Sequence, residues 1–119
     1  MTRPAVRIRR AYEPPEPSDG SRVLVDRLWP RGVTKAEADL EEWCKQAAPS
    51  AELRKWYGHD PQRFGEFRRR YRAELGRDEA AQAVAHLREL AALRPLTLIT
   101  ATKDVDISGA SVLAEVLSE

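Results

Sequence analysis

The chain has 119 residues, a length that favours one domain with a single core and leaves two independent domains marginal. Its 20 Lys and Arg residues nearly balance its 19 Asp and Glu residues, so the net charge of +1 excludes a global attraction to nucleic acid or to anionic membranes. Any anion site must therefore be local. The single cysteine, Cys44, excludes an intramolecular disulfide and a multi-cysteine zinc site, and we expect it to be a buried apolar residue.

The start of the chain does not resemble a targeting segment. The first ten residues contain four arginines and no apolar run of the kind that a secretion signal needs. No stretch approaches the roughly 20 apolar residues of a membrane span. We therefore expect a cytoplasmic protein with no membrane contact.

The first two predicted elements are strands. Val6 and Ile8, with the more distant Tyr12, alternate with arginines and predict a half-buried strand that ends at the prolines of residues 14–17. A turn at residues 18–20 closes this stiff connection. Residues 22–28 contain the continuous run Val-Leu-Val that is typical of an interior strand covered on both faces.

The middle of the chain begins with a helix start and then becomes ambiguous. Thr34 and Glu37 have the spacing of a capping box, which predicts a helix after Gly32. Helical periodicity continues through residues 36–47, and a short helix followed by a strand over residues 40–47 is the alternative. Both interpretations stay open on these residues alone.

Two helices follow. Ser50 is expected to cap a helix over residues 51–57, which Gly58 ends in a left-handed conformation. Asp60 and Pro61 start the next helix, whose apolar stripe comprises Phe64, Phe67, Tyr71 and Leu75 and whose exposed side is expected to carry the ion pairs Glu66–Arg70 and Arg70–Glu74.

The last third predicts a helix over residues 79–93, a strand over residues 96–100 and a helix over residues 108–117. Strands that alternate with helices favour a parallel sheet. The predicted fold is α/β: a single three-layer domain over residues 1–119, with a small, largely parallel sheet of about four strands and helices on its faces.

Open parallel sheets bind ligands beyond the carboxyl ends of their strands, and this rule selects residues 26–32, 49–50 and 102–111. Asp26 emerges from a buried strand and is either an ion-pair partner of Arg27 or Arg31, or a direct ligand or catalytic acid-base group. Trp29 and Pro30 predict a rigid pocket wall, to which Arg31 adds a cation.

Further candidates lie in the other loops and in one helix. Ser50 either caps its helix or contributes to an anion site at the helix N-terminus. His59 is an acid-base candidate, or a cap for the preceding helix. Arg68 borders an apolar stripe and is a candidate anion ligand, and Lys103 either faces the same anion as Arg31 or pairs with Asp104 or Asp106. The two histidines make no zinc signature, so no metal is predicted.

Four segments together resemble a known family: D-R-L-W-P-R-G at residues 26–32, A-P-S at 48–50, L-R-K-W-Y-G-H-D-P at 53–61 and F-R-R-R-Y at 67–71. They are similar to the YeaO-like branch of the domain-of-unknown-function family 488 (DUF488), over residues 7–117. The resemblance implies a compact α/β fold in a bacterial-type family whose function is open, with a short helix and a strand in the ambiguous middle.

One departure from that family bears on function. Relatives typically carry an Asn-His pair after the last strand, where this chain has Ser108 and Gly109. If that His is catalytic in relatives, either His59 substitutes for it here or the activity is absent.

Three hypotheses follow. The first is a small-molecule enzyme or binder with a phosphate- or carboxylate-bearing ligand, in which Asp26 and His59 are acid-base candidates and the ligand contacts are Arg27, Trp29, Arg31, Ser50, Trp56, Arg68 and Lys103. The second is a non-catalytic regulatory or interaction module that uses Trp29, Trp56 and arginines as anchors, with nucleic acid disfavoured. In the third, Asp26, Arg27 and Trp29 only rigidify the core. The sequence does not define the substrate, reaction, cofactor or oligomeric state, or whether the protein is an enzyme.

Overall fold

Four short parallel strands form the centre of the protein. In the computed structural model, which describes residues 6–119, these strands are β1 (Val6–Arg10), β2 (Ser21–Leu24), β3 (Glu42–Trp43) and β4 (Leu96–Thr100). The sheet order is β1-β4-β2-β3, and every neighbouring pair is parallel. Strand β4 is buried along its whole length, as expected of an apolar strand at the centre of a parallel sheet. The predicted α/β fold with a four-stranded parallel sheet is confirmed.

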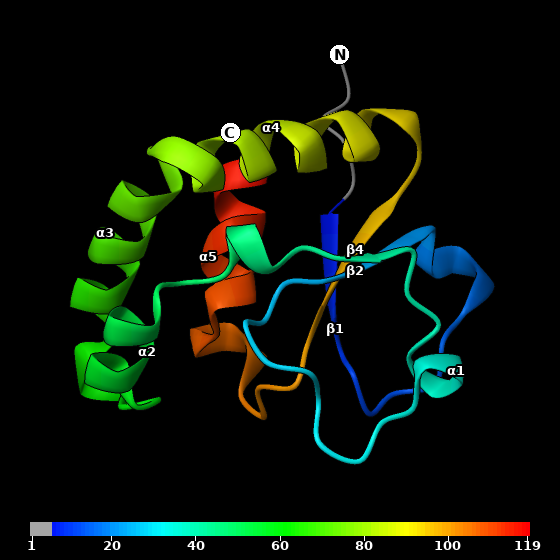
Figure 1. Cartoon of the computed structure of the whole chain (residues 1–119), viewed down its shortest axis with the longest axis horizontal. Helices are drawn as coiled ribbons and strands as arrows, with labels where there is room; N and C mark the ends of the chain where they lie inside the picture. Colours follow the sequence, from blue (N-terminus) through cyan, green and yellow to red (C-terminus); the bar gives the residue numbers. More distant parts are fainter. Residues whose placement is uncertain (1–5) are drawn as a thin grey trace.

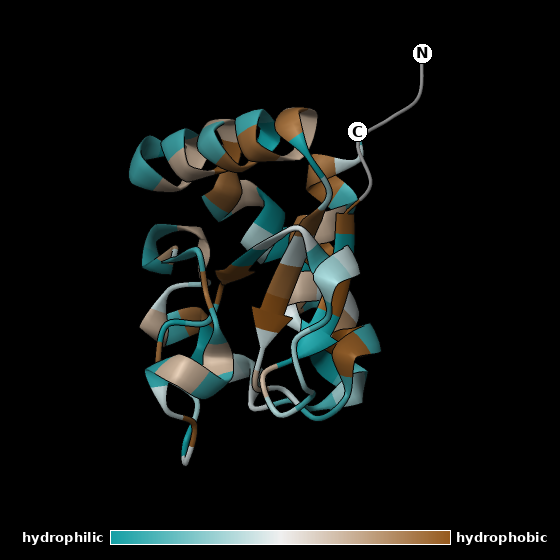
Figure 2. Cartoon of the chain, turned by 90° about the vertical axis from the view of Figure 1, so that its right-hand side faces the viewer, coloured by the Kyte–Doolittle hydropathy of each residue, from teal (hydrophilic) through white to brown (hydrophobic). Residues whose placement is uncertain are grey.

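The two faces of the sheet carry unequal layers. One face is covered by α2 (Ala51–Tyr57), α3 (Phe64–Leu75), α4 (Asp78–Leu93) and α5 (Gly109–Leu117). In Figure 1, α2, α3 and α5 lie to the left of the strands, and α4 runs across the top. The other face is covered by α1 (Lys35–Ala38) and by loops. Figure 2 shows the apolar strand residues at the centre of the molecule.

Alternation along the strands explains how two cores form around one sheet. Val23, Leu96 and Leu98 face the main core beneath α2 to α5. Leu24 and Ile99, one position along, face a smaller core that also contains Trp29, Leu40 and Trp43. Because side chains on a strand alternate in direction, both faces of β2 and β4 are apolar and must be covered.

Local start and stop signals act as predicted. Thr34 and Glu37 form the reciprocal capping box of α1. The Ser50 hydroxyl accepts the Leu53 N–H at the start of α2, and Gly58 ends that helix with a φ of 52°. Asp60 caps a 3₁₀ turn over Pro61–Arg63 that leads directly into α3.

Residues 40–47 follow the family resemblance and not the helical periodicity. Cys44 N–H donates to the Leu24 carbonyl at 2.8 Å, so the chain adds β3 to the edge of the sheet before a 3₁₀ turn over Lys45–Ala47. Leu40 and Trp43 contact the smaller core, whereas Cys44 and Ala47 reach the main core. Periodicity was misleading because these four residues are divided between two cores.

Three other expectations were wrong in detail. Strand β2 ends at Leu24 and not at residue 28. The Val25 N–H still donates to the Ile99 carbonyl, and beyond Val25 the chain leaves the sheet. Tyr12 is 48% exposed and not turned inward, because β1 has already ended at Arg10. Glu74 bonds to Ser50 and makes no ion pair with Arg70, while the expected Glu66–Arg70 pair is present at 2.7 Å.

A buried ion-pair network was not anticipated. Asp19 is fully buried at the end of a 3₁₀ turn, Pro17–Asp19, and pairs with Arg22 Nη1 at 2.6 Å and Arg9 Nη1 at 3.2 Å. The Arg22 side chain is also buried and donates to the carbonyls of Ala38 and Asp39. Through Arg22, this network fixes α1 and the first connection against the sheet.

Candidate functional site

The loops that follow β1, β2 and β4 meet at one end of the sheet. Because these strands are parallel, their carboxyl ends share an edge, which lies at the bottom of Figure 1. Residues 25–31 and 101–104, together with Tyr12 and side chains at the end of α2, line a cavity of about 710 Å³. We call this space the strand-end cavity.

The structure brings six of the nine sequence-predicted site residues to this cavity and places three elsewhere. Those at the cavity are Asp26, Arg27, Trp29, Arg31, His59 and Lys103. Those outside its lining are Ser50, Trp56 and Arg68.

Asp26 is held by the neighbouring strand and not by an arginine. Its Oδ1 accepts the Thr100 hydroxyl at 2.7 Å, and its Oδ2 accepts the Ala101 N–H at 2.8 Å. The ion pair expected with Arg27 or Arg31 is absent from the described residues, because the last residue of β4 and the residue after it supply both partners. Burial raises the pKa of Asp26, and the bonds from Ala101 and Thr100 and the nearby charges of His59 and Arg54 oppose that rise.

Asp26→Asn is expected to raise the melting temperature at pH 7 by roughly 2–4 °C, or about 0.5–1 kcal/mol for a chain of this size. A raised pKa means that folding favours the protonated form, so stability falls as the pH rises through the pKa of folded Asp26. An Asn amide keeps an acceptor for Ala101 and a donor for Thr100 without the buried charge.

Thermal melts at about pH 4 and pH 8 test this, since the gain should shrink at the lower pH, because a raised pKa leaves more of the folded wild type protonated at Asp26 there. Asp106→Asn, at an exposed position, is the matched control. A variant that melts below the wild type at both pH values would contradict the expectation.

Trp29 and Arg27 combine structural contacts with positions in the lining. The Trp29 indole donates to the Val33 carbonyl at 2.6 Å and meets the Trp43 ring edge-on, with centroids 5.4 Å apart. Arg27 Nε donates to the Pro49 carbonyl at 3.1 Å. These contacts hold the wall of the cavity in one conformation.

Four cations in the lining, with Arg27 among them, have no carboxylate partner within residues 6–119, and three of the four are exposed. The exposed three are Arg31, Arg54 and Lys103, and none lies within 4.0 Å of an Asp or Glu oxygen in the described part of the chain. The expected alternative for Lys103, a salt bridge to Asp104 or Asp106, is therefore not formed. Asp104 instead caps the turn Val105–Ile107 through the Asp106 N–H.

His59 reaches the cavity from a strained backbone. It follows Gly58 and has a φ of 56°, in the left-handed region that side chains other than glycine rarely occupy. Its ring lies 5.8 Å from the Tyr57 ring and makes no hydrogen bond to any described residue, so it does not cap α2 as the alternative predicted. His59 therefore lines the cavity without a hydrogen-bond partner among residues 6–119.

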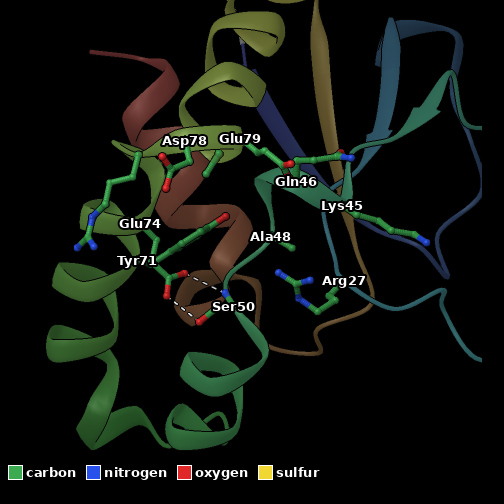
Figure 3. Close-up of a pocket in the computed structure, with 11 residues that line it drawn as sticks. Arg27, Lys45, Gln46, Ala48, Ser50, Tyr71, Glu74, Asp78 and Glu79 are labelled. Carbon is green, nitrogen blue, oxygen red and sulfur yellow. Dashed lines mark hydrogen bonds between the residues drawn. The ribbon is translucent and has the colours of Figure 1, made fainter.

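Ser50 lies in a different pocket, shown in Figure 3. Its backbone N–H donates to Glu74 Oε1 at 2.9 Å, and its hydroxyl donates to Glu74 Oε2 at 2.7 Å. The helix N-terminus does attract an anion, as its unsatisfied amides predict, but that anion is the carboxylate of Glu74 from α3. Ser50 does not line the strand-end cavity.

Trp56 and Arg68 also lie away from the cavity. Arg70 is stacked over the Trp56 ring at 4.4 Å from its centroid, and Arg63 approaches the same ring at 5.4 Å. Arg68 pairs with Glu115 of α5 at 2.7 Å. Trp29 and Trp56 line different pockets and do not form one anchor surface.

Arg54 was missed by the sequence analysis. It lies three residues before Tyr57 on α2, and both side chains line the cavity. The spacing of three residues on a helix would have placed them on one face, but nothing local shows which face meets the strand ends.

Gly109 marks the position at which the family resemblance places a histidine. It is the first residue of α5 and lines the cavity, while Ser108 is buried and caps the helix. A Cβ at Gly109 would lie 3.3 Å from Pro49 Cγ and 3.5 Å from the Tyr71 ring. A Cβ at position 109 would therefore require Pro49 to shift by a few tenths of an ångström, whereas its contact with Tyr71 would be ordinary.

Residues 6–119 lack two further features. No group of three or more His, Cys, Asp or Glu side chains there is arranged to hold a metal ion. Within the same part of the chain, no helix has both the length and the apolar composition needed to cross a membrane.

Sequence comparison defines the class to which this fold and cavity belong. The chain belongs to the DUF488 family: residues 5–119 match the model described as the inactive DUF488-N3 subclade. It is 50% identical over 113 residues to the uncharacterized protein Rv3073c of Mycobacterium tuberculosis, covering 95% of this chain and 93% of that protein. It is 43% identical over 110 residues to the uncharacterized protein YeaO of Escherichia coli, covering 92% and 94%. No solved structure matches the chain.

Proposed function

We propose that this protein binds an anionic small molecule, with a phosphate or carboxylate group, in the strand-end cavity, and that it acts as a binder without catalysing a reaction. The observation that carries the proposal is the presence of Arg31, Arg54 and Lys103 in one lining without carboxylate partners among the described residues. Cations that protrude into a shared cavity are the usual means of holding an anion.

The charge balance of the lining supports the same conclusion. Four permanent cations, with Arg27 as the fourth, face two carboxylates, Asp26 and Asp104. Both carboxylates are already engaged, Asp26 by residues at the end of β4 and Asp104 by its own turn. The cavity therefore has a local positive excess that the near-neutral chain as a whole does not have.

A binder is favoured over an enzyme by two independent facts. The matched family model is described as an inactive subclade. In addition, both oxygens of Asp26 accept hydrogen bonds from residues at the end of β4, so the carboxylate is poorly placed to exchange protons with a ligand. His59 then serves as a further hydrogen-bond donor to the anion.

The test is calorimetric titration of the full chain with inorganic phosphate and citrate at fixed ionic strength. Arg54→Ala is expected to weaken binding by about 10-fold or more, because it removes one charge-assisted hydrogen bond. Lys55→Ala is the matched control, since Lys55 is also exposed on α2 and does not line the cavity. Equal affinities of the two variants, or no binding of either anion by the wild type, would refute the proposal.

A further inference from the structure

We infer that the ligand is an organic anion in which a flat apolar group, such as an aromatic ring, is joined to the phosphate or carboxylate. This inference rests on the proposed function and concerns the same cavity. It follows from three features of the lining: its size, its apolar floor and its apolar rim.

The cavity is much larger than one anionic group requires. Its volume of about 710 Å³ lies within the range of roughly 300–1,000 Å³ that is typical of sites for whole organic ligands. A single phosphate or carboxylate bound to Arg31, Arg54 or Lys103 would leave most of this space to water.

The floor of the cavity is apolar. It is formed by Val25, Tyr57, Phe67 and Ala110, all buried members of the main core that nevertheless contribute to the lining. Tyr57 and Phe67 are stacked with centroids 4.1 Å apart, and the Tyr57 hydroxyl is engaged by the Ile107 carbonyl at 2.6 Å. A polar group placed here would lose water without gaining a partner, whereas an apolar group would gain from the contact.

The rim is also apolar, and it is held in place. Among residues 6–119, three large hydrophobic side chains are exposed, and two of them, Tyr12 (48%) and Leu28 (57%), line this cavity. The Tyr12 hydroxyl donates to the Arg31 carbonyl at 3.0 Å, and the Arg10 guanidinium lies over its ring at 5.3 Å. A fixed aromatic ring beside a cation offers a stacking surface at low entropic cost.

The experiment compares pairs of probes that share an anionic group: phenyl phosphate with inorganic phosphate, and benzoate with acetate. Calorimetry of the wild-type chain is expected to show the aromatic member binding at least about 10-fold more tightly in at least one pair. Leu28→Ala and Tyr12→Ala should weaken binding of the aromatic probe more than binding of its partner, and so remove most of this advantage. Tyr12→Phe, which keeps the ring, should retain it.

Leu93→Ala is the matched control, because Leu93 is the third exposed large hydrophobic residue and does not line the cavity. If inorganic phosphate binds and neither aromatic probe binds more tightly than its partner, the inference fails while the proposed function stands. If an aromatic advantage survives both Leu28→Ala and Tyr12→Ala, the assignment of the rim is overturned. If no probe binds, the proposed function fails, and the inference fails with it.

Discussion

Asp19→Ala is expected to lower the free energy of unfolding by about 3–5 kcal/mol, since it leaves a buried guanidinium without its partner. Asp19 is fully buried and accepts hydrogen bonds from Arg22 Nη1 at 2.6 Å and from the Glu16 N–H at 3.0 Å. The Arg22 side chain would then keep only carbonyl partners in α1 and the residue after it. In a thermal melt at neutral pH the loss corresponds to roughly 12–20 °C.

The pH dependence of stability gives a second readout of the same network. Burial acts to raise the pKa of Asp19, but the bonds from Glu16 and Arg22 and the charge of Arg9 outweigh it and leave the pKa lowered. A carboxyl group whose pKa is lowered by folding stabilises the fold at pH values above its pKa in the unfolded chain. That stabilisation is lost as the pH falls through the pKa of the group in the folded state. The wild type should therefore lose stability below about pH 4, and Asp19→Ala should lose less over that range.

Two further variants make this prediction specific. Asp106→Ala changes an exposed aspartate and should shift stability by no more than about 0.5 kcal/mol. The double variant Asp19→Ala with Arg22→Met removes the unpaired cation as well, so it should be more stable than Asp19→Ala alone. A loss below about 1 kcal/mol in the single variant would mean that the Arg22 charge does not depend on Asp19.

The elements that sequence predicts best are those whose signals are local. Helix α2 and strand β4 have the predicted bounds. Their signals, which are Ser50, Gly58 and the apolar run of β4, determine the structure of residues next to them in the chain. The helical periodicity of residues 40–47 was misleading, because consecutive apolar side chains in this segment enter two different cores. A pattern on one segment carries no information about which core each residue meets.

The site divides in the same way. The meeting of Asp26 and Lys103 at one edge follows from the parallel sheet, which the alternation of elements predicts. The hydrogen-bond partners of the site residues do not follow from the sheet. Asp26 bonds to Thr100 and makes no ion pair with an arginine, and Glu74, 24 residues along the chain from Ser50, bonds to the Ser50 hydroxyl. Such pairings depend on how the helices dock against the sheet, which is a property of the whole fold.

Arg54→Glu combined with Lys103→Glu is expected to reduce the affinity for phosphate by more than about 100-fold. Each substitution removes a charge-assisted hydrogen bond worth about 1.5–3 kcal/mol, and each adds a carboxylate that repels the ligand. The lining changes from four permanent cations and two carboxylates to two cations and four carboxylates. Stability should change little, since both side chains are exposed and neither loses an ion pair with a described residue.

The matched control is Lys35→Glu combined with Lys55→Glu, which makes the same change in net charge at exposed positions outside the cavity. Calorimetry at two ionic strengths separates a local effect from a global one, because the contribution of distant charges is screened by salt. If both double variants lost affinity equally, the protein would attract anions only through its overall charge. If Arg54→Glu with Lys103→Glu bound phosphate as the wild type does, the anion would bind outside the strand-end cavity, because a lining with four carboxylates and two permanent cations would repel it.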